Sequence, residues 1–421
     1  MQPRRLLFIH YILKEVTHMP QASLKPSANP TIYGILIAIS SGHFINDTLQ
    51  AVVPAMFPII EESLQLSYTQ IGWIAFALNM TSSLLQPVFG FYADIRSRPF
   101  LLPLGMASSL AGLIGFALSG HFIWIILSVL LIGFGSAIFH PEGSRVAYMA
   151  AGRRRGLAQS IYQVGGNTGQ SLAPLITAFV FVPYGQKGAL WFSILAVIGI
   201  IVLFSVSRWY AERIQSRETL PTRSKGEKTP INPKIKWAMV FVVFLVFARS
   251  WYGAGLSNYY QFYLIDDYGL SIKQAQPYIF TFMFAGVLGT FLGGPLADRF
   301  GKRNIIFFSM LGAAPFTLAL PYLSLPLVYP VIFTIGLILS SSFSVIVVYA
   351  QELLPKKIGM VSGLTVGLAF GMGAVGAVIF GGLADVYTIR FVMVLCSFLP
   401  LFGMLTFFLP TDDAVRGFHK E

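Results

Sequence analysis

The chain has 421 residues, of which 55% are hydrophobic and 11% charged, and its mean hydropathy is +0.70. This composition excludes an ordinary water-soluble globular domain. The net charge of +12 does not indicate a nucleic-acid partner, because nearly all the cations are spread over the tails, the ends of apolar runs and one hydrophilic stretch.

Residues 1–30 form a polar N-terminal tail that precedes the first apolar run. The segment from Leu6 to Leu13 is apolar after Arg4 and Arg5, but it is short and no small-residue cleavage site follows it. Either Met19 is the true start of the protein, or residues 1–18 are an unstructured or surface-lying leader.

The apolar runs that follow are about 20 residues or longer, which is enough to cross a hydrocarbon core of about 30 Å as a helix. Backbone groups in lipid must be satisfied within the segment, so the runs are predicted to be helices. We predict twelve spans: roughly 33–59, 70–91, 100–119, 122–141, 157–181, 189–207, 237–263, 275–297, 304–323, 327–350, 358–382 and 389–409.

Positive charge is distributed unevenly between the two ends of these spans. Of the 29 Lys and Arg residues, all except Lys187, Arg249, Lys273 and Arg390 fall on the side that holds both termini. By the positive-inside rule this side is the cytoplasm. The sequence therefore predicts a multi-pass protein of the inner (cytoplasmic) membrane with both termini inside.

A glycine, acid and cation motif occurs twice in the chain. The full copy runs from Gly294 to Arg303, and a degraded copy runs from Gly90 to Arg98, 204 residues earlier. The glycines of two basic turns, Gly156 and Gly359, are separated by almost the same distance. This spacing predicts a duplicated, all-α protein with an N-terminal six-helix bundle at 31–207, a basic cytoplasmic linker at 208–236, a C-terminal six-helix bundle at 237–410 and a tail at 411–421.

With its motif and its twelve spans, the chain resembles the major facilitator superfamily of transporters. Within that superfamily it resembles the fosmidomycin resistance protein subfamily over residues 30–410. The segments that carry this second resemblance are 41–47 (SGHFIND), 83–88 (SLLQPV), 139–145 (FHPEGSR), 157–167 (LAQSIYQVGGN) and 349–355 (YAQELLP). The resemblance implies the major facilitator fold and proton-driven drug efflux.

The duplicated motif is predicted to contribute to a cytoplasmic gate. By the family's pattern, Asp94 would face the start of the eleventh helix near Gly359, and Asp298 the start of the fifth helix near Gly156. The alternative is that the motif only sets turn geometry and topology. The candidate gating residues are Gly90, Asp94, Arg98, Arg145, Gly294, Asp298, Arg299, Gly301, Lys302 and Arg303. The first copy has Ile95 and Ser97 where the second has Arg299 and Gly301, so its cation network departs from the pattern.

Asp47 is the sharpest candidate for proton coupling, because an ionisable residue deep in a span is costly to keep there. His43 lies one helical turn before it, and Asn46 and Gln50 lie beside it as candidate substrate-binding residues. Asp47 either exchanges protons with His43 or is a structural carboxyl paired permanently with it.

Arg249 is the counterpart of this position in the second half, and arginine stays charged in a membrane. It is predicted either to bind an anionic substrate, with Asp47 as its resting counter-ion, or to form a fixed ion pair that joins the halves. The resemblance favours a phosphonate, which suits a guanidinium fork.

The remaining candidates lie on helices 4, 5 and 7. His140 (substrate) and Glu142 (proton coupling) are expected with Arg145 near the cytoplasmic end of a helix kinked at Pro141, where a salt bridge to Arg98 is the alternative. Gln163, Asn167 and Tyr252 are candidate substrate-binding residues that either line a cavity or join helices by hydrogen bonds.

Several other classes of function find little support in the sequence. There is no Walker loop and no zinc motif, and the GxGxxG at Gly371 lies mid-helix, so neither a cofactor nor a metal is expected. The prediction is a monomeric secondary transporter that handles a small molecule and protons in a lipid bilayer and binds no nucleic acid. Uptake or exchange of a metabolite or anion is the alternative direction, and a membrane sensor or intramembrane enzyme is a remote one.

Overall fold

The computed structural model describes residues 31–95, 98–152, 155–215, 233–354 and 358–418. The predicted N-terminal tail and most of the basic linker lie outside the described residues, as does the side chain of Asp94. In the described part the chain is helical, with no strand.

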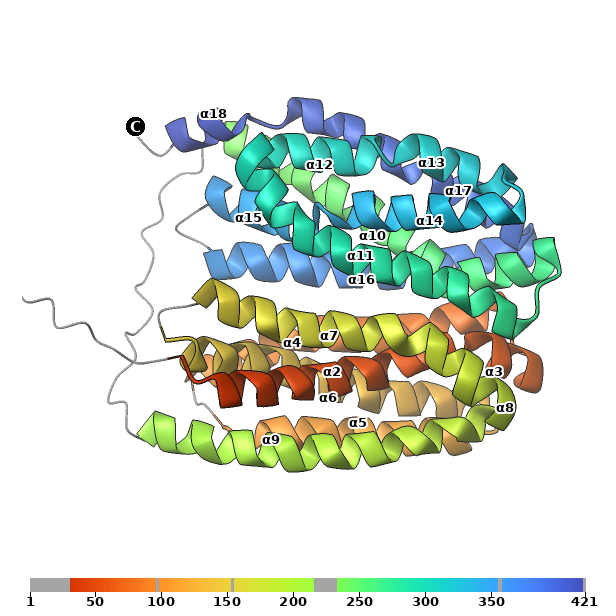
Figure 1. Cartoon of the computed structure of the whole chain (residues 1–421), viewed down its shortest axis with the longest axis horizontal. Coiled ribbons are helices and arrows are strands. Elements are labelled where there is room, and N and C mark those ends of the chain that lie inside the picture. Colours follow the sequence, from red (N-terminus) through yellow and green to blue (C-terminus); the bar gives the residue numbers. More distant parts are fainter. Residues whose placement is uncertain (1–30, 96–97, 153–154, 216–232, 355–357, 419–421) are drawn as a thin grey trace, which may run out of the picture.

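Helices of the N-terminal half make up the first six predicted spans. They are α2 (Tyr33–Ala55) with α3 (Phe57–Leu64), α4 (Tyr68–Ile95), α5 (Leu101–Leu118), α6 (Phe122–Ala150), α7 (Arg155–Ile176) with η1 (Thr177–Phe181) and α8 (Val182–Tyr184), and η2 (Gln186–Leu190) with α9 (Trp191–Gln215). Figure 1 shows this half, from red to yellow-green, as a bundle of roughly parallel helices in the lower part of the view.

Helices of the C-terminal half repeat the plan. They are α10 (Pro233–Tyr268), α11 (Ile272–Phe300), α12 (Lys302–Leu311) with α13 (Ala314–Ala319) and η3 (Leu320–Tyr322), α14 (Leu325–Ser340) with α15 (Phe343–Leu353), α16 (Ile358–Val386), and α17 (Ile389–Ser397) with η5 (Leu399–Phe408). A short helix α18 (Asp412–Gly417) follows. The twelve predicted spans are therefore present, and the all-α prediction is confirmed.

Among the described residues, eight helical segments are long and apolar enough to cross a membrane by length and composition alone. The first, second and fifth spans are not among them, and the eleventh contributes the shorter apolar helix Gly371–Val386. The helices of these four spans, α2, α4, α7 and α16, form the main helix pairs of the interior, with α2 on α7 and α4 on α16. Polar side chains on α2 and α7, described below, lower the hydropathy of two of these spans because they serve an interior rather than lipid.

We call the end of the molecule that holds Tyr33 and Phe300 the terminal end, and the end that holds Tyr68 and Asp385 the far end. Glycines bring the two halves into contact at the far end. A Cβ on Gly72 of α4 would lie 2.7 Å from the Ala377 carbonyl oxygen of α16, and one on Gly381 would collide with the Tyr68 carbonyl oxygen. Because glycine has no side chain, α4 and α16 can pack with their backbones in contact at these positions.

The duplicated motif lies at the terminal end and is tied to its own half. Gly301 has a positive φ of 86°, and the amide of the next residue, Lys302, donates to Asp412 of α18 (2.6 Å). The Lys302 ammonium pairs with Glu352 at 2.9 Å, and Arg303 donates to the Thr406 and Phe407 carbonyls. The carboxylates of Asp412 and Glu352 thus hold the start of α12 against α18 and the end of α15.

Asp298 was expected to face the start of the fifth helix near Gly156, and this part of α7 lies outside the residues whose side chains the structure describes. Asp298 is exposed and lines a cavity of about 420 Å³ with Gly301, Lys302, Arg303 and Asp412. Close packing occurs at Gly293, just before the motif, where a Cβ would collide with the Ser341 carbonyl, and not at Gly294, where it would meet open space. Neighbouring residues on a helix face directions about 100° apart, which is why the two glycines differ.

Glu61 in α3 provides a pH-dependent test of the far end. Burial, and then the carboxylates of Asp266 and Glu62, raise the pKa of Glu61, whose charge also acts on Tyr68. A raised carboxyl pKa means that the charged form destabilises the fold at neutral pH and that this cost disappears at low pH.

We expect Glu61→Gln to raise the thermal unfolding midpoint at pH 7, by an amount equivalent to about 0.5 kcal/mol at this half-exposed position, and to leave it unchanged at pH 4. A thermal shift measured in detergent at both pH values checks this, with Glu212→Gln, an exposed carboxylate of α9 that does not act on Glu61, as control. Equal shifts at both pH values would contradict it.

Candidate functional site

Asp47 lies at the centre of a buried polar cluster in the N-terminal half. It sits in the middle of α2 with only 3% of its surface exposed, and His43, one turn earlier on the same helix, is equally buried. The His43 Nε2 atom lies 3.4 Å from Asp47 Oδ2, and His140 Nε2 of α6 lies 3.6 Å from Oδ1. We call these three residues the His–Asp triad.

The hydrogen bonds of His43 define its tautomer. Its Nδ1 lies 2.8 Å from the Tyr162 carbonyl oxygen, which only accepts, so Nδ1 carries a hydrogen. The ring also stacks on Tyr162 with centroids 4.1 Å apart. The nitrogen that faces Asp47 is therefore Nε2. This atom carries a lone pair in the neutral ring and a hydrogen, which it can donate, in the charged ring. Two basic nitrogens and a carboxylate thus face one another, an arrangement that favours binding of a cation.

Amide side chains complete the surroundings of Asp47. Asn46 donates to its Oδ1 at 3.0 Å, and Gln170 of α7 donates to its Oδ2 at 2.8 Å. Ser136 of α6, which donates to Gln50 at 2.6 Å, lies 3.5 Å from the Asn46 amide. The polar residues predicted beside Asp47 thus form a hydrogen-bonded network that links α2, α6 and α7.

Gly166 of α7 makes room for the triad. A Cβ at this position would overlap His43 Nε2 and lie 2.7 Å from Asp47 Oδ2. Its neighbours Gly165 and Gly169 similarly let α7 approach the α2 backbone at Ser40 and Phe44. Sequence reasoning did not include Gly166 among the site residues, although the Gly-Gly pair beside a polar stripe was a signal for it.

We expect Gly166→Ala to reduce transport at least tenfold while the protein still inserts and folds. The added methyl group must push His43 away from Asp47, and overpacking of this kind costs about 1–3 kcal/mol. Gly34→Ala, on α2 where a Cβ meets nothing within 4 Å, is the matched control. Transport by both variants, measured at equal amounts of reconstituted protein, checks this; wild-type rates in the Gly166 variant would show that the triad tolerates displacement.

The predicted cluster of His140, Glu142 and Arg145 is divided by the structure. The α6 helix continues past Pro141 to Ala150, so His140 lies well inside the span and not near its cytoplasmic end. Glu142 turns away from Asp47 and accepts a hydrogen bond from Tyr210 of α9 at 2.9 Å. Residues two apart on a helix point about 200° apart, which is why His140 and Glu142 cannot share a site. Arg98 is exposed at the terminal end, beside the Tyr92 ring.

On α7 the polar stripe contributes through Gln170 and not through the two residues named as candidates. Gln163 is exposed and Asn167 half-buried, and neither contacts the triad by a hydrogen bond among the described residues. Tyr252 of α10 is buried, and its hydroxyl has no hydrogen-bond partner in the described part of the chain.

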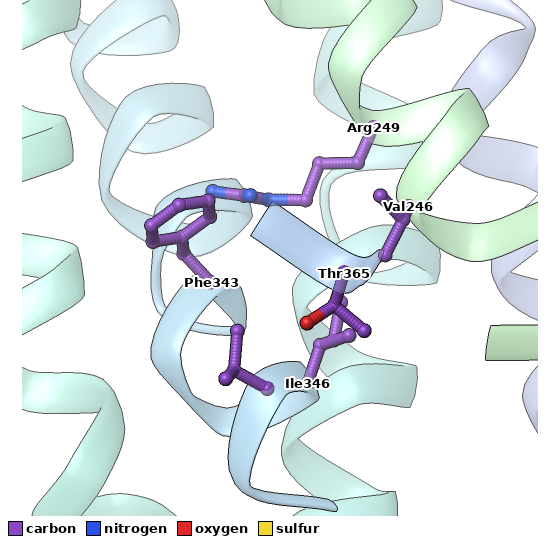
Figure 2. A pocket seen from close by; sticks show the side chains of 6 residues that line it. Val246, Arg249, Phe343, Ile346 and Thr365 are labelled. Atoms are coloured by element: carbon purple, nitrogen blue, oxygen red, sulfur yellow. The ribbon is translucent and has the colours of Figure 1, made fainter. Parts of the chain in front are cut away.

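Arg249 lies on α10 in the C-terminal half, as predicted, but its neighbours differ from those expected. Its Nε donates to the Leu339 carbonyl at 3.2 Å, and its guanidinium carbon lies 4.8 Å from the centre of the Phe343 ring. Figure 2 shows the guanidinium extended over this ring, with Val246, Ile346 and Thr365 around it. The adjoining hollow is about 10 Å³, room for roughly one water molecule.

The expected resting ion pair between Asp47 and Arg249 is absent from the described residues. The carboxylate of Asp47 is engaged by the histidines and amides of its own half, and no carboxylate that the structure describes lies within ion-pair distance of Arg249. The physical reason is that the imidazoles next to Asp47 belong to its own bundle. The guanidinium of Arg249 contacts the Leu339 carbonyl and the face of the Phe343 ring instead.

The donor atoms of the His–Asp triad lie within 4.8 Å of one another, so they could also hold a metal ion. The described residues offer no fourth His, Cys or carboxylate at this place, and both oxygens of Asp47 already accept amide hydrogen bonds. This grouping could not be predicted from the sequence, since His140 comes from a helix far along the chain. We interpret the triad as a proton site and test the metal below.

The fold and the buried charges define a polytopic membrane protein built as two six-helix halves around a polar interior. Residues 39–374 match the family model of the Major Facilitator Superfamily, and the chain belongs to that family. It is therefore a transporter and not an enzyme.

Two bacterial relatives align over most of both chains. The chain is 55% identical to the uncharacterized MFS-type transporter YfnC of Bacillus subtilis (strain 168), over 93% of this chain and 96% of the relative. It is 48% identical to the fosmidomycin resistance protein of Escherichia coli (strain K12), over 91% and 94% respectively. The resemblance predicted from the sequence is thus confirmed.

A solved structure shows the same fold at low identity. A bacterial homolog of the human lysosomal transporter Spinster, in an inward-facing and occupied conformation, superposes with a TM-score of 0.72 at 18% identity. The match covers 90% of this chain and 97% of that one.

Proposed function

We propose that the chain is a proton-coupled antiporter that exports a small anionic or amphipathic compound through the inner membrane, with the terminal end in the cytoplasm. The observation that carries the proposal is the separation of two interior charges. A carboxylate flanked by two imidazoles lies in one half, and a guanidinium without a carboxylate partner in the described residues lies in the other.

The proton pathway follows from the exposure of the triad. His140 is the accessible member, with 25% of its side chain exposed, whereas the side chains of Asp47 and His43 are each 4% exposed. A proton from water reaches His140 first and passes to Asp47. Since Nδ1 of His43 is already committed to the Tyr162 carbonyl, its Nε2 is the atom that gains or loses a proton opposite Asp47.

The substrate class follows from Arg249. A guanidinium held by one carbonyl and stacked on Phe343 retains donors for an anion, and the ring favours an apolar group beside that anion. Similarity to the fosmidomycin resistance protein supports a phosphonate-like compound. The hollow beside Arg249 is too small for such a molecule, so we place the compound in the space between the halves, with its anion at Arg249.

Flux in inside-out vesicles tests this proposal. A proton gradient, acidic inside, should drive fosmidomycin or a related anion into the vesicles, and a protonophore should abolish the uptake. A chelator should have no effect; loss of transport on chelation, restored by a metal ion, would assign the triad to a metal. Flux in the opposite direction would make the chain an uptake or exchange carrier, and binding without flux would make it a sensor. Either result would overturn the proposal.

A further inference from the structure

A carboxylate of the C-terminal half binds the start of a helix in the N-terminal half at the far end. Asp385 of α16 accepts from the backbone amides of Tyr68 (2.8 Å) and Thr69 (2.7 Å), the first two residues of α4. The Thr69 hydroxyl donates to the same carboxylate. Helix N-termini leave amides unsatisfied and carry partial positive charge, so a carboxylate is the group that suits this place.

The remaining amides of the first turn of α4 are satisfied locally. Ser67 and Gln70 form a capping box, in which the Gln70 amide donates to Ser67 Oγ (3.2 Å) and the Ser67 amide to Gln70 Oε1 (2.9 Å). The Ile71 amide donates to the Ser67 carbonyl. Asp385 therefore accepts from the two amides that the capping box leaves unpaired, those of Tyr68 and Thr69, and it does so from the other half of the molecule.

Three more hydrogen bonds join the halves around this point, one of them from the Tyr259 hydroxyl of α10 to the Tyr68 carbonyl at 3.4 Å. The Tyr68 hydroxyl donates to Asp266 of α10 at 2.9 Å, and Gln261 of α10 donates to the Pro54 carbonyl at 3.2 Å. The residues around Asp385 form a glycine–leucine–alanine–aspartate sequence, Gly382 to Asp385, which repeats Gly294, Leu296, Ala297 and Asp298 of the duplicated motif without its proline. The same short sequence thus places an aspartate at the end of α11 and at the end of α16, at opposite ends of the molecule.

The repeated half lacks the corresponding contact. The capping box of α11, Ser271 with Gln274, lies 204 residues after that of α4, the same spacing as the duplicated motif. The residue 204 positions before Asp385 is Phe181, which has no charge. In the described part of the chain no carboxylate accepts from the Ile272 or Lys273 amide, and Lys273 instead lies 6.0 Å from the Phe179 ring. Only one of the two equivalent junctions is bound by a carboxylate.

We propose that Asp385 is a positioning residue of the transport cycle, a latch between α16 and α4 that holds the far end closed on one side only. The junction between α11 and η1 then yields first when the halves separate. Opening the latch transfers two helix-terminal amides and one carboxylate to water. The free energy that keeps the latch closed is therefore the difference between these hydrogen bonds and the hydration of the separated groups. The proposal requires only that the two halves separate at the far end.

The test measures the distance between the halves in reconstituted full-length protein. Spin labels are placed on cysteines that replace the exposed Tyr184 and Tyr322, at the far end of either half, in a background where the buried Cys396 is serine. Double electron–electron resonance then measures the distance between the two labels, and the distance distribution gives the ratio of open to closed forms. We expect Asp385→Asn to raise the ratio of open to closed forms about tenfold and Thr69→Ala about threefold.

Asp267→Asn is the matched control. Asp267 is a carboxylate at the same end that pairs with Arg390 of its own half at 3.4 Å, so its loss removes the same charge but no contact between the halves. Unchanged distances in both Asp385→Asn and Thr69→Ala, or equal shifts in Asp267→Asn, would overturn the latch. The measurement uses neither substrate nor a proton gradient, so its failure is distinct from failure of the proposed antiport.

Discussion

Asp47→Asn is expected to abolish proton-driven transport while leaving substrate exchange intact. Asparagine keeps the shape of the side chain and can still bond with Gln170 and Asn46, but it cannot bind a proton or attract a charged imidazole. We expect active export to fall at least a hundredfold and counterflow of labelled substrate, which needs no net proton movement, to stay within about threefold of wild type, on the usual scale of losing a charged partner in a low-dielectric site.

The measurement compares gradient-driven uptake and counterflow in the same vesicles. His140→Gln separates the roles within the triad, because it removes the partly exposed imidazole and leaves the buried His43–Asp47 pair, so it should shift the pH dependence of export without abolishing it. Asp267→Asn, remote from the interior, should behave as wild type. Normal proton-driven export by Asp47→Asn would remove Asp47 from the coupling mechanism and leave it a structural carboxyl.

The helices and the duplication could be predicted from the sequence because both are encoded locally. Apolar length dictates a helix wherever lipid denies the backbone other partners, and the spacing of two motifs needs no coordinates. The ends of helices were less certain. Proline at position 141 suggested the end of a span, yet α6 continues to Ala150, because helices in membranes tolerate a proline whose freed backbone groups find other partners.

Partners between distant helices could not be predicted in this way. Asp47 and His43 lie four residues apart, so their pairing was predictable, whereas His140, Gln170 and Gly166 reach the same point from two other helices. Which face of α6 or α7 turns inward depends on packing against α2. A rotation of the helix by one residue, about 100°, would bring different side chains to the site. The same limit explains the error over Arg249, since its depth followed from the repeat but its neighbours did not.

The far end shows a different limit. The chemistry of Asp385 was visible in the sequence, but a glycine–leucine–alanine–aspartate segment at the end of a span does not reveal which helix start it faces. The contact with α4 depends on Gly72 and Gly381, which together allow the two backbones to meet. A residue that joins two halves is defined by both of them, and neither half alone contains the information.

Replacing Arg249 is expected to weaken binding of anionic substrates selectively. Arg249→Gln removes the charge, and the net loss of one charge-assisted hydrogen bond to an anion corresponds to about a 10- to 100-fold rise in KM.

Arg249→Lys keeps the charge but loses the fork and the planar stack on Phe343, so it should fall between wild type and the glutamine variant. Phe343→Leu preserves the volume but removes the aromatic face, and should raise KM by only about threefold. Uptake kinetics for an anionic substrate and a neutral amphipathic one, measured in the same vesicles, distinguish the possible roles of the guanidinium. If it anchors the anion, only the anionic substrate is affected. If both substrates lose kcat equally, Arg249 supports the structure of the C-terminal half, and the anion must bind elsewhere in the interior.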